Sequence, residues 1–338
     1  MKRVTLQQVA DKVGVTKGLV SRALRGKYNV SEKMREEITQ AAVAMGYDFN
    51  KLRAKSKRRS KCVLIMTSDM LLKKDYWQPI IRTLTVTLEE THISLEYLIY
   101  DENTLSQADV VRLKTVDASG YVFMNNNSEL LVRAAENTNL PVVVIDPKKV
   151  MSGRHLQIKY SNFNSFYDIT KMLISLGHRD ILFYGPKGES ASFTEREQGF
   201  LTCIADNEVG ATAREVLFTN DDGQYADNGR FEQTLKKYPS VTAVLCANDI
   251  IAINALKSIT AMGKSVPADY SLVGFDNIAE SANPKIDLTT VNVPREELGA
   301  EAARYIINHI NNKQIKYSQI VIDCETVVRG SVANARGR

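Results

Sequence analysis

The stretch VTLQQVADKVGVTKGLVSRALRG, residues 4–26, predicts two short helices joined by a tight turn. Thr5 can cap the first helix, and Gln8, three positions later, completes the pattern of a capping box. Gly14 interrupts the helical pattern, and Thr16 is placed to cap the second helix. Apolar residues recur at helical spacing on one face of each helix. Together these signals predict a helix-turn-helix.

A third helix is expected after Ser31, which can serve as its N-terminal cap, and Gly46 marks its end. The apolar residues expected to face inward from this helix are Met34, Ile38, Ala41, Ala42 and Met45. Three small helices with a short turn between the first two are typical of the helix-turn-helix plan. Residues 1–49 are therefore interpreted as an all-α head.

The outward face of the second predicted helix carries side chains that can read DNA. Arg22 can donate a bidentate pair of hydrogen bonds to guanine, and Lys17 can donate to the same base edge. The hydroxyls of Thr5 and Thr16 suit phosphate oxygens, which position a protein on the duplex. The candidate DNA-binding residues of the head are Thr5, Thr16, Lys17, Gly18, Ser21, Arg22, Arg25, Tyr28 and Asn29. The alternative is a small helical bundle with a solvated basic face.

A strongly basic segment follows the head at residues 50–61. Its basic residues are Lys51, Arg53, Lys55, Lys57, Arg58, Arg59 and Lys61. Their mutual repulsion is neutralised on DNA, so a helix could form in this segment when DNA is bound. Asn50, Arg53 and Lys57 are the candidate DNA contacts here. The alternative is a solvated linker that touches phosphates without specificity.

The charge of the chain is unevenly divided. Residues 1–61 carry 16 basic and 5 acidic residues, a net charge of +11, although the whole chain has a formal net charge of only +5. The rest of the chain is therefore acidic. A basic head on an acidic body predicts a polyanion partner for the head alone.

From Cys62 onward, short apolar runs alternate with helix-like stretches. The predicted strands are residues 62–66, 95–100, 120–124, 142–146, 180–185, 215–218, 243–248 and 271–276. Helices are expected at 76–91, 106–116 and 128–138. Two runs of strand–helix alternation predict two doubly wound lobes with parallel sheets, and their ligands are expected at the carboxyl ends of the strands.

Polar residues follow several of these predicted strands. They are Thr67, Ser68, Asp69, Asn125, Asn126, Asn127, Asp146, Asn248, Asp249, Asp276 and Asn277. Carboxylate, amide and hydroxyl groups at one edge of a sheet suit a small polyhydroxyl or polar ligand. Each position also precedes a predicted helix, so a helix cap is the alternative for any one of them.

Other classes of protein are not supported. The chain has no G-x-S-x-G, no G-x-x-x-x-G-K-[ST] and no H-E-x-x-H, so an enzyme is not expected. The four cysteines lie far apart without a C-x-x-C, and we expect reduced thiols, no metal site and no cofactor. With no apolar leader and no membrane-length apolar run, the expected location is the cytoplasm of a bacterium, with nucleoid association when DNA is bound.

Further motifs extend the pattern along the whole chain. After the opening stretch come VSEKMREEI and MGY, and the body adds LGHRDILF, REQGF, ANDIIAINAL, SLVGFDN, LTTVNVPREELG and VVRGS. In this order and at this spacing, the motifs resemble the lactose/galactose repressor (LacI/GalR) family of bacterial transcription regulators. The resemblance covers essentially the whole chain.

The resemblance implies a domain plan. Residues 1–49 would form the helix-turn-helix DNA-binding domain and residues 50–61 the hinge. Residues 62–338 would form an α/β bilobed body similar to periplasmic sugar-binding proteins. Its N-lobe would span about 62–158 and 291–319, and its C-lobe about 159–290 and 320–332.

The resemblance also implies a function. A homodimer would bind a pseudo-palindromic double-stranded DNA operator as a repressor, and a sugar or sugar-like effector between the lobes would change its operator affinity. Effector contacts are implied at Arg196, Asn248, Asp276 and Asp146, and the candidate set adds Ser68, Asp69 and Phe193. Arg196 can donate a fork of hydrogen bonds to ring hydroxyls or a carboxylate. The alternative for Arg196 is a buried ion pair with Asp276.

The sequence departs from the family pattern at several places. In the hinge window, Phe49 replaces a proline and Ser56 stands where an apolar wedge belongs, so DNA binding should depend more on phosphate contacts. In the body, Ser161 replaces an aspartate. Gln224 stands at the usual aromatic position with Tyr225 one residue late, which makes an ordinary pyranose effector less expected.

Two further readings stay open. No leucine heptad follows Ser331, so the sequence predicts a dimer rather than a tetramer. The alternative function is a cytosolic sugar-binding or sugar-processing protein that uses the basic head as a non-specific anchor. Within the regulator class, a phosphoprotein partner could act in place of the effector.

Overall fold

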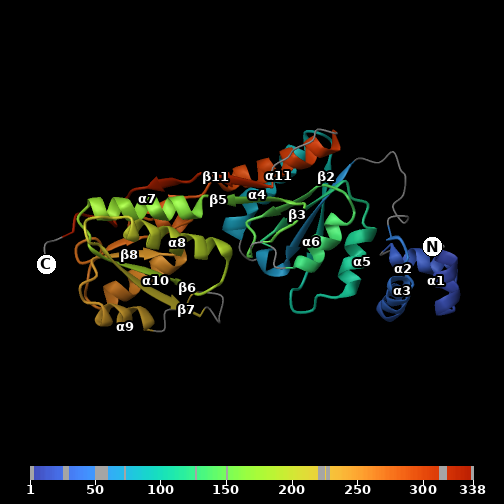
Figure 1. The fold of residues 1–338 in the computed structure, drawn as a ribbon, viewed down its shortest axis with the longest axis horizontal. Helices are drawn as coiled ribbons and strands as arrows, with labels where there is room; N and C mark the ends of the chain where they lie inside the picture. The colour runs from blue at the N-terminus through green and yellow to red at the C-terminus, as the bar shows by residue number, and fades with distance from the viewer. Residues whose placement is uncertain are drawn as a thin grey trace. The chain divides into compact units, whose positions relative to one another are not determined.

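The computed structural model describes residues 4–25, 30–49, 60–71, 74–125, 128–149, 151–219, 225, 229–311 and 318–335 (Figure 1). The chain divides into two compact units. Unit 1 comprises Met1–Pro147, Met151–Ile158 and Glu296–Ile320. Unit 2 comprises Lys148–Val150, Lys159–Arg295 and Val321–Arg338.

The head contains the three predicted helices, each with the predicted cap. They are α1 (Leu6–Val13), α2 (Lys17–Leu24) and α3 (Glu32–Ala44). Thr5 and Gln8 form the reciprocal capping box, and Thr16 and Ser31 accept hydrogen bonds from the first turns of α2 and α3. Gly14 ends α1 at φ 75°, a left-handed backbone conformation that glycine adopts without steric cost. The helix-turn-helix prediction is confirmed.

One apolar cluster holds the three helices together. It is built from the faces that the periodicity identified and from two aromatic rings after α3. Its fully buried members are Val9, Ala10, Val20, Ala23, Leu24, Ile38, Ala42, Tyr47 and Phe49. Tyr47 and Phe49 meet edge to face at 5.5 Å between ring centroids. Phe49, which departs from the family pattern, is therefore a core residue of the head.

The body of unit 1 is a parallel sheet with the strand order β11-β5-β4-β3-β1-β2. Its strands are β1 (Lys61–Thr67), β2 (Ser94–Tyr100), β3 (Gly120–Met124), β4 (Val142–Ile145), β5 (Leu156–Tyr160) and β11 (Gln319–Ile322). The pairs from β2 through β5 run parallel in register. The first four strands confirm their predictions, whereas the sequence did not predict β5 and β11.

Two pairs of helices pack on the sheet of unit 1. They are α4 (Lys74–Glu89) with α11 (Arg295–Ile310), and α5 (Gln107–Thr115) with α6 (Glu129–Glu136). Side chains of α5 and α6 share one apolar cluster with Val63 and Ile65 of β1. Gly299 lets α11 approach α4 closely, since a Cβ there would lie 2.3 Å from the carbonyl oxygen of Ile80. This close packing fixes α11 against the sheet.

Unit 2 has a second parallel sheet, with the order β7-β6-β8-β9. Its strands are β6 (Asp180–Pro186), β7 (Thr212–Phe218), β8 (Ala243–Cys246) and β9 (Ser271–Val273). Helices α7 (Asn162–Ser175) and α8 (Ala191–Ala205) lie on one side, and α9 (Arg230–Lys237) and α10 (Asp249–Ala261) lie on the other (Figure 1). A two-stranded antiparallel sheet joins β10 (Thr290–Asn292) to β12 (Glu325–Val327). The doubly wound fold predicted for each half of the body is confirmed.

The four cysteines carry free thiols, as expected. Cys62, Cys203 and Cys246 are buried and Cys324 is half-buried. Burial raises the pKa of the Cys62 thiol to about 12, which keeps it protonated. Within the described ranges, no group of three side chains is arranged to hold a metal ion. None of the described helices is both long and apolar enough to cross a bilayer.

Candidate DNA interface and effector site

The outward face of α2 presents its basic residues to solvent. Lys17, Gly18 and Arg22 are exposed, and Ser21 is half-buried. A Cβ at position 18 would lie 3.8 Å from Nη1 of Arg22, so the guanidinium extends back along the helix over Gly18. Among the residues that the structure describes, Lys17 and Arg22 have no ion pair or hydrogen bond through their side chains. Both therefore keep all their donors for a partner.

The two threonines predicted to contact phosphate are also helix caps. Oγ1 of Thr16 accepts from the amide of Leu19 at 3.2 Å, and Oγ1 of Thr5 accepts from the amide of Gln8 at 3.3 Å. In each case an oxygen lone pair serves the cap, and the Thr5 hydroxyl also donates to Oε1 of Gln8 at 3.2 Å. A phosphate contact would therefore use the hydroxyl hydrogen of Thr16 or the free amides of the first turn. The Thr16 cap thus fixes the start of α2, where an anion can approach the remaining amides of the first turn.

The remaining predicted DNA contacts divide by position. Arg25 is exposed and ends α2, where its amide donates to the carbonyl of Ser21 at 3.2 Å. The other predictions, Tyr28, Asn29, Asn50, Arg53 and Lys57, lie outside the described residues, as does Ser56 of the hinge window.

In unit 2, the guanidinium of Arg196 on α8 is the centre of a buried polar cluster. Its Nε donates to Oδ1 of Asn162 at 3.0 Å, and its Nη1 donates to the carbonyl of Ala247 at 2.7 Å. Its Cζ lies 3.6 Å from the ring centroid of Phe275, a cation–π contact. The side chain is only 4% exposed. Two of the three guanidinium nitrogens are thus used by the protein itself.

Asp276 and Asn248 stand beside this arginine. Oδ1 of Asp276 lies 3.9 Å from Nη2 of Arg196, so the ion pair proposed as an alternative exists, but it is loose. Asp276 adopts φ 108°, an uncommon backbone conformation for a residue with a Cβ. Asn248 caps α10, where its Oδ1 accepts from the amide of Ile251 at 2.9 Å. No partner for its Nδ2 is found in the described part of the chain, so Asn248 can be both cap and ligand contact.

Asp249, next in the chain, holds the loop that carries Asp276. Its Oδ2 accepts from the amide of Ile278 at 2.9 Å, and its Oδ1 accepts from the hydroxyl of Thr290 at 2.5 Å. Burial, with the nearby Asp276 carboxylate, raises the pKa of Asp249 to about 7. The sequence predicted this aspartate only as one polar residue among many, and its role as a loop anchor depends on the fold.

Three residues outside the predicted effector contacts, Tyr225, Asn162 and Glu189, belong to the cluster around Arg196. Tyr225 packs edge to face on Phe193 at 6.2 Å between ring centroids, and its hydroxyl donates to Oε1 of Glu189 at 3.5 Å. Burial, then the carboxylates of Glu189 and Asp276, raise the pKa of Tyr225. The ring centroid of Phe193 lies 5.1 Å from Cζ of Arg196. The displaced aromatic residue therefore reaches the same cluster, and Asn162 and Glu189 join it.

The predicted effector contacts of unit 1 lie at the carboxyl ends of its strands. Ser68 is exposed and begins the short helix η2 (Ser68–Leu71) directly after β1. Asp146 follows β4 with φ 45°, and its Oδ2 accepts from the hydroxyl of Tyr76 at 3.3 Å. Asp69 belongs to the same short helix, and its side chain lies outside the described part of the structure.

Comparison with known families matches both parts of the chain. The family model described as bacterial regulatory proteins, lacI family, matches residues 5–50. The model described as a periplasmic binding protein-like domain matches residues 170–332. The head and most of unit 2 thus correspond to the two parts that the resemblance predicted.

Curated relatives match over nearly their whole length. The HTH-type transcriptional regulator CelR of Thermobifida fusca is 28% identical over 348 residues, with 98% of this chain and 98% of CelR covered. The HTH-type transcriptional repressor CytR of Escherichia coli (strain K12) is 26% identical over 330 residues, with 97% and 96% covered. These relatives are regulators rather than enzymes, as the sequence predicted.

Solved structures show the same fold. The transcriptional regulator CelR–cellobiose complex has a TM-score of 0.68 at 25% identity, over 97% of this chain and 100% of that chain. The lac repressor dimer bound to operator and the anti-inducer ONPF has a TM-score of 0.65 at 23% identity, over 98% and 100%. This chain therefore carries a LacI family DNA-binding domain followed by a periplasmic binding protein-like domain, and it aligns from end to end with bacterial transcriptional regulators.

Proposed function

We propose that this chain is a transcriptional repressor that binds a pseudo-palindromic operator as a homodimer and changes its operator affinity when a small polar effector binds. The observation that carries the proposal is the solvent-facing pair Lys17 and Arg22 on a capped helix of a helix-turn-helix head. A protein gains nothing for its own stability by leaving such donors unpaired, whereas a base edge can use them. The protein would act in the cytoplasm and on the nucleoid.

The charges of the effector site favour a neutral polyhydroxyl effector. Arg196 has already given two of its nitrogens to Asn162 and Ala247, and its charge faces Asp276. Glu189 adds a second carboxylate to the same cluster. An anionic ligand would meet more negative than positive charge there, while hydroxyl groups can donate to the carboxylates and accept from the amide of Asn248.

The effector class also fits the relatives. CelR, at 25% identity, has been solved in complex with cellobiose. Phe193 and Tyr225 offer apolar ring surface of the kind that packs against sugar rings. The polar groups around Arg196 would fix the orientation of the ligand through hydrogen bonds. Ser68, Asp69 and Asp146 of unit 1 remain part of the proposed contact set.

An exposed apolar surface on unit 1 is suited to the homodimer. β2 is the edge strand of its sheet, and its Tyr97 and Ile99 are 49% and 37% exposed on one face. Val86 of α4, which packs beside β2, is 50% exposed. Exposed apolar side chains gathered on neighbouring elements are typical of interfaces between proteins. We therefore assign them to the contact between the two copies.

The test is operator binding by fluorescence anisotropy. Duplexes tiled across the upstream region of the gene should include one that binds at least about 10³-fold tighter than a scrambled duplex. With about six phosphates neutralised, the logarithm of the binding constant should fall with the logarithm of salt concentration at a slope near −5. Equal affinity for every duplex at all salt concentrations would refute sequence-specific regulation. A thermal-shift screen with neutral sugars and nucleosides would then identify the effector, because a bound ligand raises the melting temperature.

A further inference from the structure

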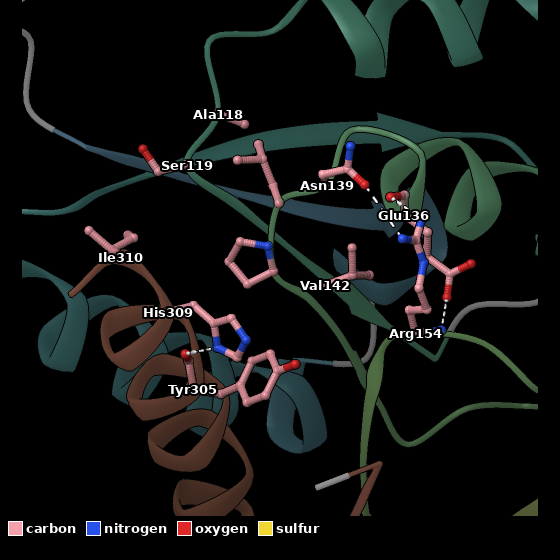
Figure 2. A pocket seen from close by; sticks show the side chains of 11 residues that line it. Ala118, Ser119, Glu136, Asn139, Val142, Arg154, Tyr305, His309 and Ile310 are labelled. Carbon is pink, nitrogen blue, oxygen red and sulfur yellow. Dashed lines mark hydrogen bonds between the residues drawn. The ribbon is translucent and has the colours of Figure 1, made fainter. Parts of the chain in front are cut away.

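A pocket lies in unit 1, apart from every residue assigned to DNA or to the effector (Figure 2). Its volume is about 500 Å³, within the range of small-molecule sites. One wall is the last part of α11, and another is the connection from α6 to β4. Arg154, before β5, and Ser119, before β3, complete it. The proposed regulator function does not use this pocket.

Two rings of α11 face the pocket with polar groups that the protein leaves unused. Tyr305 and His309 lie 4.2 Å apart between ring centroids, one turn apart on the helix (Figure 2). Nδ1 of His309 donates to the carbonyl of Tyr305 at 3.1 Å, which leaves Nε2 for another partner. In the described ranges, neither Nε2 of His309 nor the hydroxyl of Tyr305 has a hydrogen-bond partner.

Arg154 adds a cation at the opposite wall. Its Nη2 donates to the carbonyl of Glu136 at 3.1 Å, and its Nη1 lies 3.5 Å from Oδ1 of Asn139, so these contacts hold the exposed side chain at the rim of the pocket (Figure 2). Its Nε has no partner among the described residues. The side-chain nitrogen Nδ2 of Asn139 likewise has no partner among the described residues. The pocket thus collects hydrogen-bond donors.

The one carboxylate of the pocket is already saturated. Oε1 of Glu136 accepts from the amide of Arg154 at 2.6 Å and from Nδ1 of His155 at 2.9 Å, and its Oε2 lies 3.3 Å from Nη1 of Arg133. Burial alone would raise the pKa of Glu136, but these hydrogen bonds outweigh it and hold the pKa below its ordinary value. Glu136 is therefore an ion with both oxygens occupied, and it offers little to a ligand that donates hydrogen bonds.

We infer that this pocket binds a small anion carried on a ring, a carboxylate or a phosphate monoester. The anion would accept hydrogen bonds from Arg154, Asn139 and Tyr305. The ring would pack against the Tyr305–His309 pair and the apolar side chains of Val142 and Ile310. A surplus of donors with an apolar wall matches this class, because the oxygens of an anion can accept several hydrogen bonds at once.

The position of the pocket gives such a ligand a path to the linker. The amide of Ser119 donates to the carbonyl of Lys61 at 2.7 Å, and the amide of Lys61 donates to Oγ of Ser119 at 3.3 Å. Lys61 is the first residue of β1 and the last residue of the basic segment that follows the head. A bound anion would therefore contact the wall to which the end of that segment is attached, and it should change operator affinity.

The experiment is isothermal titration of the full-length protein with benzoate and with phenyl phosphate, using benzamide as the neutral control with the same ring. At least one anion should bind saturably with a Kd below about 5 mM, and benzamide at least about tenfold more weakly. The two anions distinguish a carboxylate ligand from a phosphate ligand. No saturable binding of either anion, or equal binding of benzamide, would overturn the inference.

Variants locate the binding. Arg154→Ala and Tyr305→Phe should each weaken the anion at least about fivefold, since each removes a donor. Tyr305→Phe deletes only a hydroxyl without a described partner, so it should fold normally. Arg133→Ala is the matched control, because Arg133 pairs with the same Glu136 but does not line the pocket. Loss of binding in Arg133→Ala equal to that in Arg154→Ala, or loss in Arg196→Ala alone, would show that the anion does not bind here. The repressor proposal would stand in either case.

Discussion

Arg22 in the head and Arg196 in unit 2 carry the two halves of the proposed function, and their surroundings are opposite. Arg22 is exposed on α2, and no described residue pairs with its guanidinium. Arg196 is 4% exposed, gives two nitrogens to Asn162 and Ala247, faces Asp276 and stacks on Phe275. The guanidinium of Arg22 is free to bind a partner, whereas that of Arg196 already has partners within the protein.

The difference follows from the exposure of each guanidinium in the folded protein. An exposed guanidinium stays hydrated, so the folded head does not need to supply partners for it. A buried guanidinium without partners would cost several kcal/mol, so unit 2 must supply them. Removing Arg22 should therefore weaken binding of the partner, whereas removing Arg196 should first weaken the protein itself.

The largest expected effect is that of Arg196→Ala on the stability of unit 2. The substitution leaves Asp276 without its cation and two buried acceptors without their donor, so the free energy of unfolding should fall by about 3–5 kcal/mol. Urea unfolding monitored by circular dichroism measures this loss. Arg214→Ala is the control, because Arg214 is 36% exposed in its pair with Asp180 and should cost less than about 1 kcal/mol. Similar losses in the two variants would mean that burial of the Arg196 guanidinium does not determine its contribution to stability.

The next effect is the pH dependence that Asp249 confers. Its pKa is raised from 3.8 to about 7 in the folded protein, so the folded state retains a proton that the unfolded state has released. The free energy of unfolding should therefore fall as the pH rises from 3.8 to about 7. In Asp249→Asn, the total fall over this range should be smaller by about 2–4 kcal/mol. Urea midpoints from pH 4.5 to 7.5, about one pH unit apart, measure the slope.

A second carboxylate titrates in the same range and does not confuse the comparison. Burial and the neighbouring Glu215 raise the pKa of Glu197 to about 7. Glu197 is present in both proteins, so its contribution cancels when the slopes of the wild type and of Asp249→Asn are subtracted. Identical slopes would mean that Asp249 does not hold its proton in the folded state.

Arg22→Ala tests the exposed arginine. Loss of a bidentate base contact should weaken operator binding by about 1–3 kcal/mol, while the melting temperature and effector affinity stay unchanged. Anisotropy with the cognate and scrambled duplexes separates specific from non-specific loss. Lys12→Ala removes an exposed charge of the same sign from the last turn of α1 and serves as control. An equal loss in Lys12→Ala would mean that Arg22 acts only through its charge.

The smallest effect is expected for Thr16→Ala at the start of α2. The substitution removes the hydrogen bond to the amide of Leu19 and should cost about 1 kcal/mol of helix stability. Amide hydrogen exchange in α2 measures the local loss, which the melting temperature of the whole chain would obscure. If the amide of Leu19 exchanged no faster in the variant, the cap would contribute nothing to α2.

The strands show which parts of the sheets could be predicted from the sequence pattern. The fully buried runs of β1, β3 and β4 were predictable because a strand covered on both faces is apolar throughout. β11 alternates between exposed and half-buried residues and is short, and β5 contains a lysine and a glutamine. The β5 segment is not apolar throughout, and the apolar run in β11 is too short to stand out in the sequence. Their assignment depends on pairing with a neighbour that lies far away in the sequence.

The effector site shows a different limit. The resemblance selected Arg196, Asn248 and Asp276, and the fold places them together. The sequence offered a helix cap as the alternative for Asn248, and Asn248 does cap α10. Neither the resemblance nor the pattern revealed that Tyr225, one position after the usual aromatic position, packs on Phe193 in this cluster. Both facts depend on backbone geometry, such as φ 57° at Tyr225, that residue type alone does not specify.

By itself, the amino-acid sequence determined the caps, the three helices of the head and the division of charge between head and body. These features depend on residue identity and on interactions within about four positions along the chain. Only the tertiary structure decided which donors of Arg196 remain for a ligand, and that Tyr305 and Arg154 line one pocket. Arg196 and Ala247 are 51 positions apart, and contacts over such separations exist only once the sheets and helices have packed.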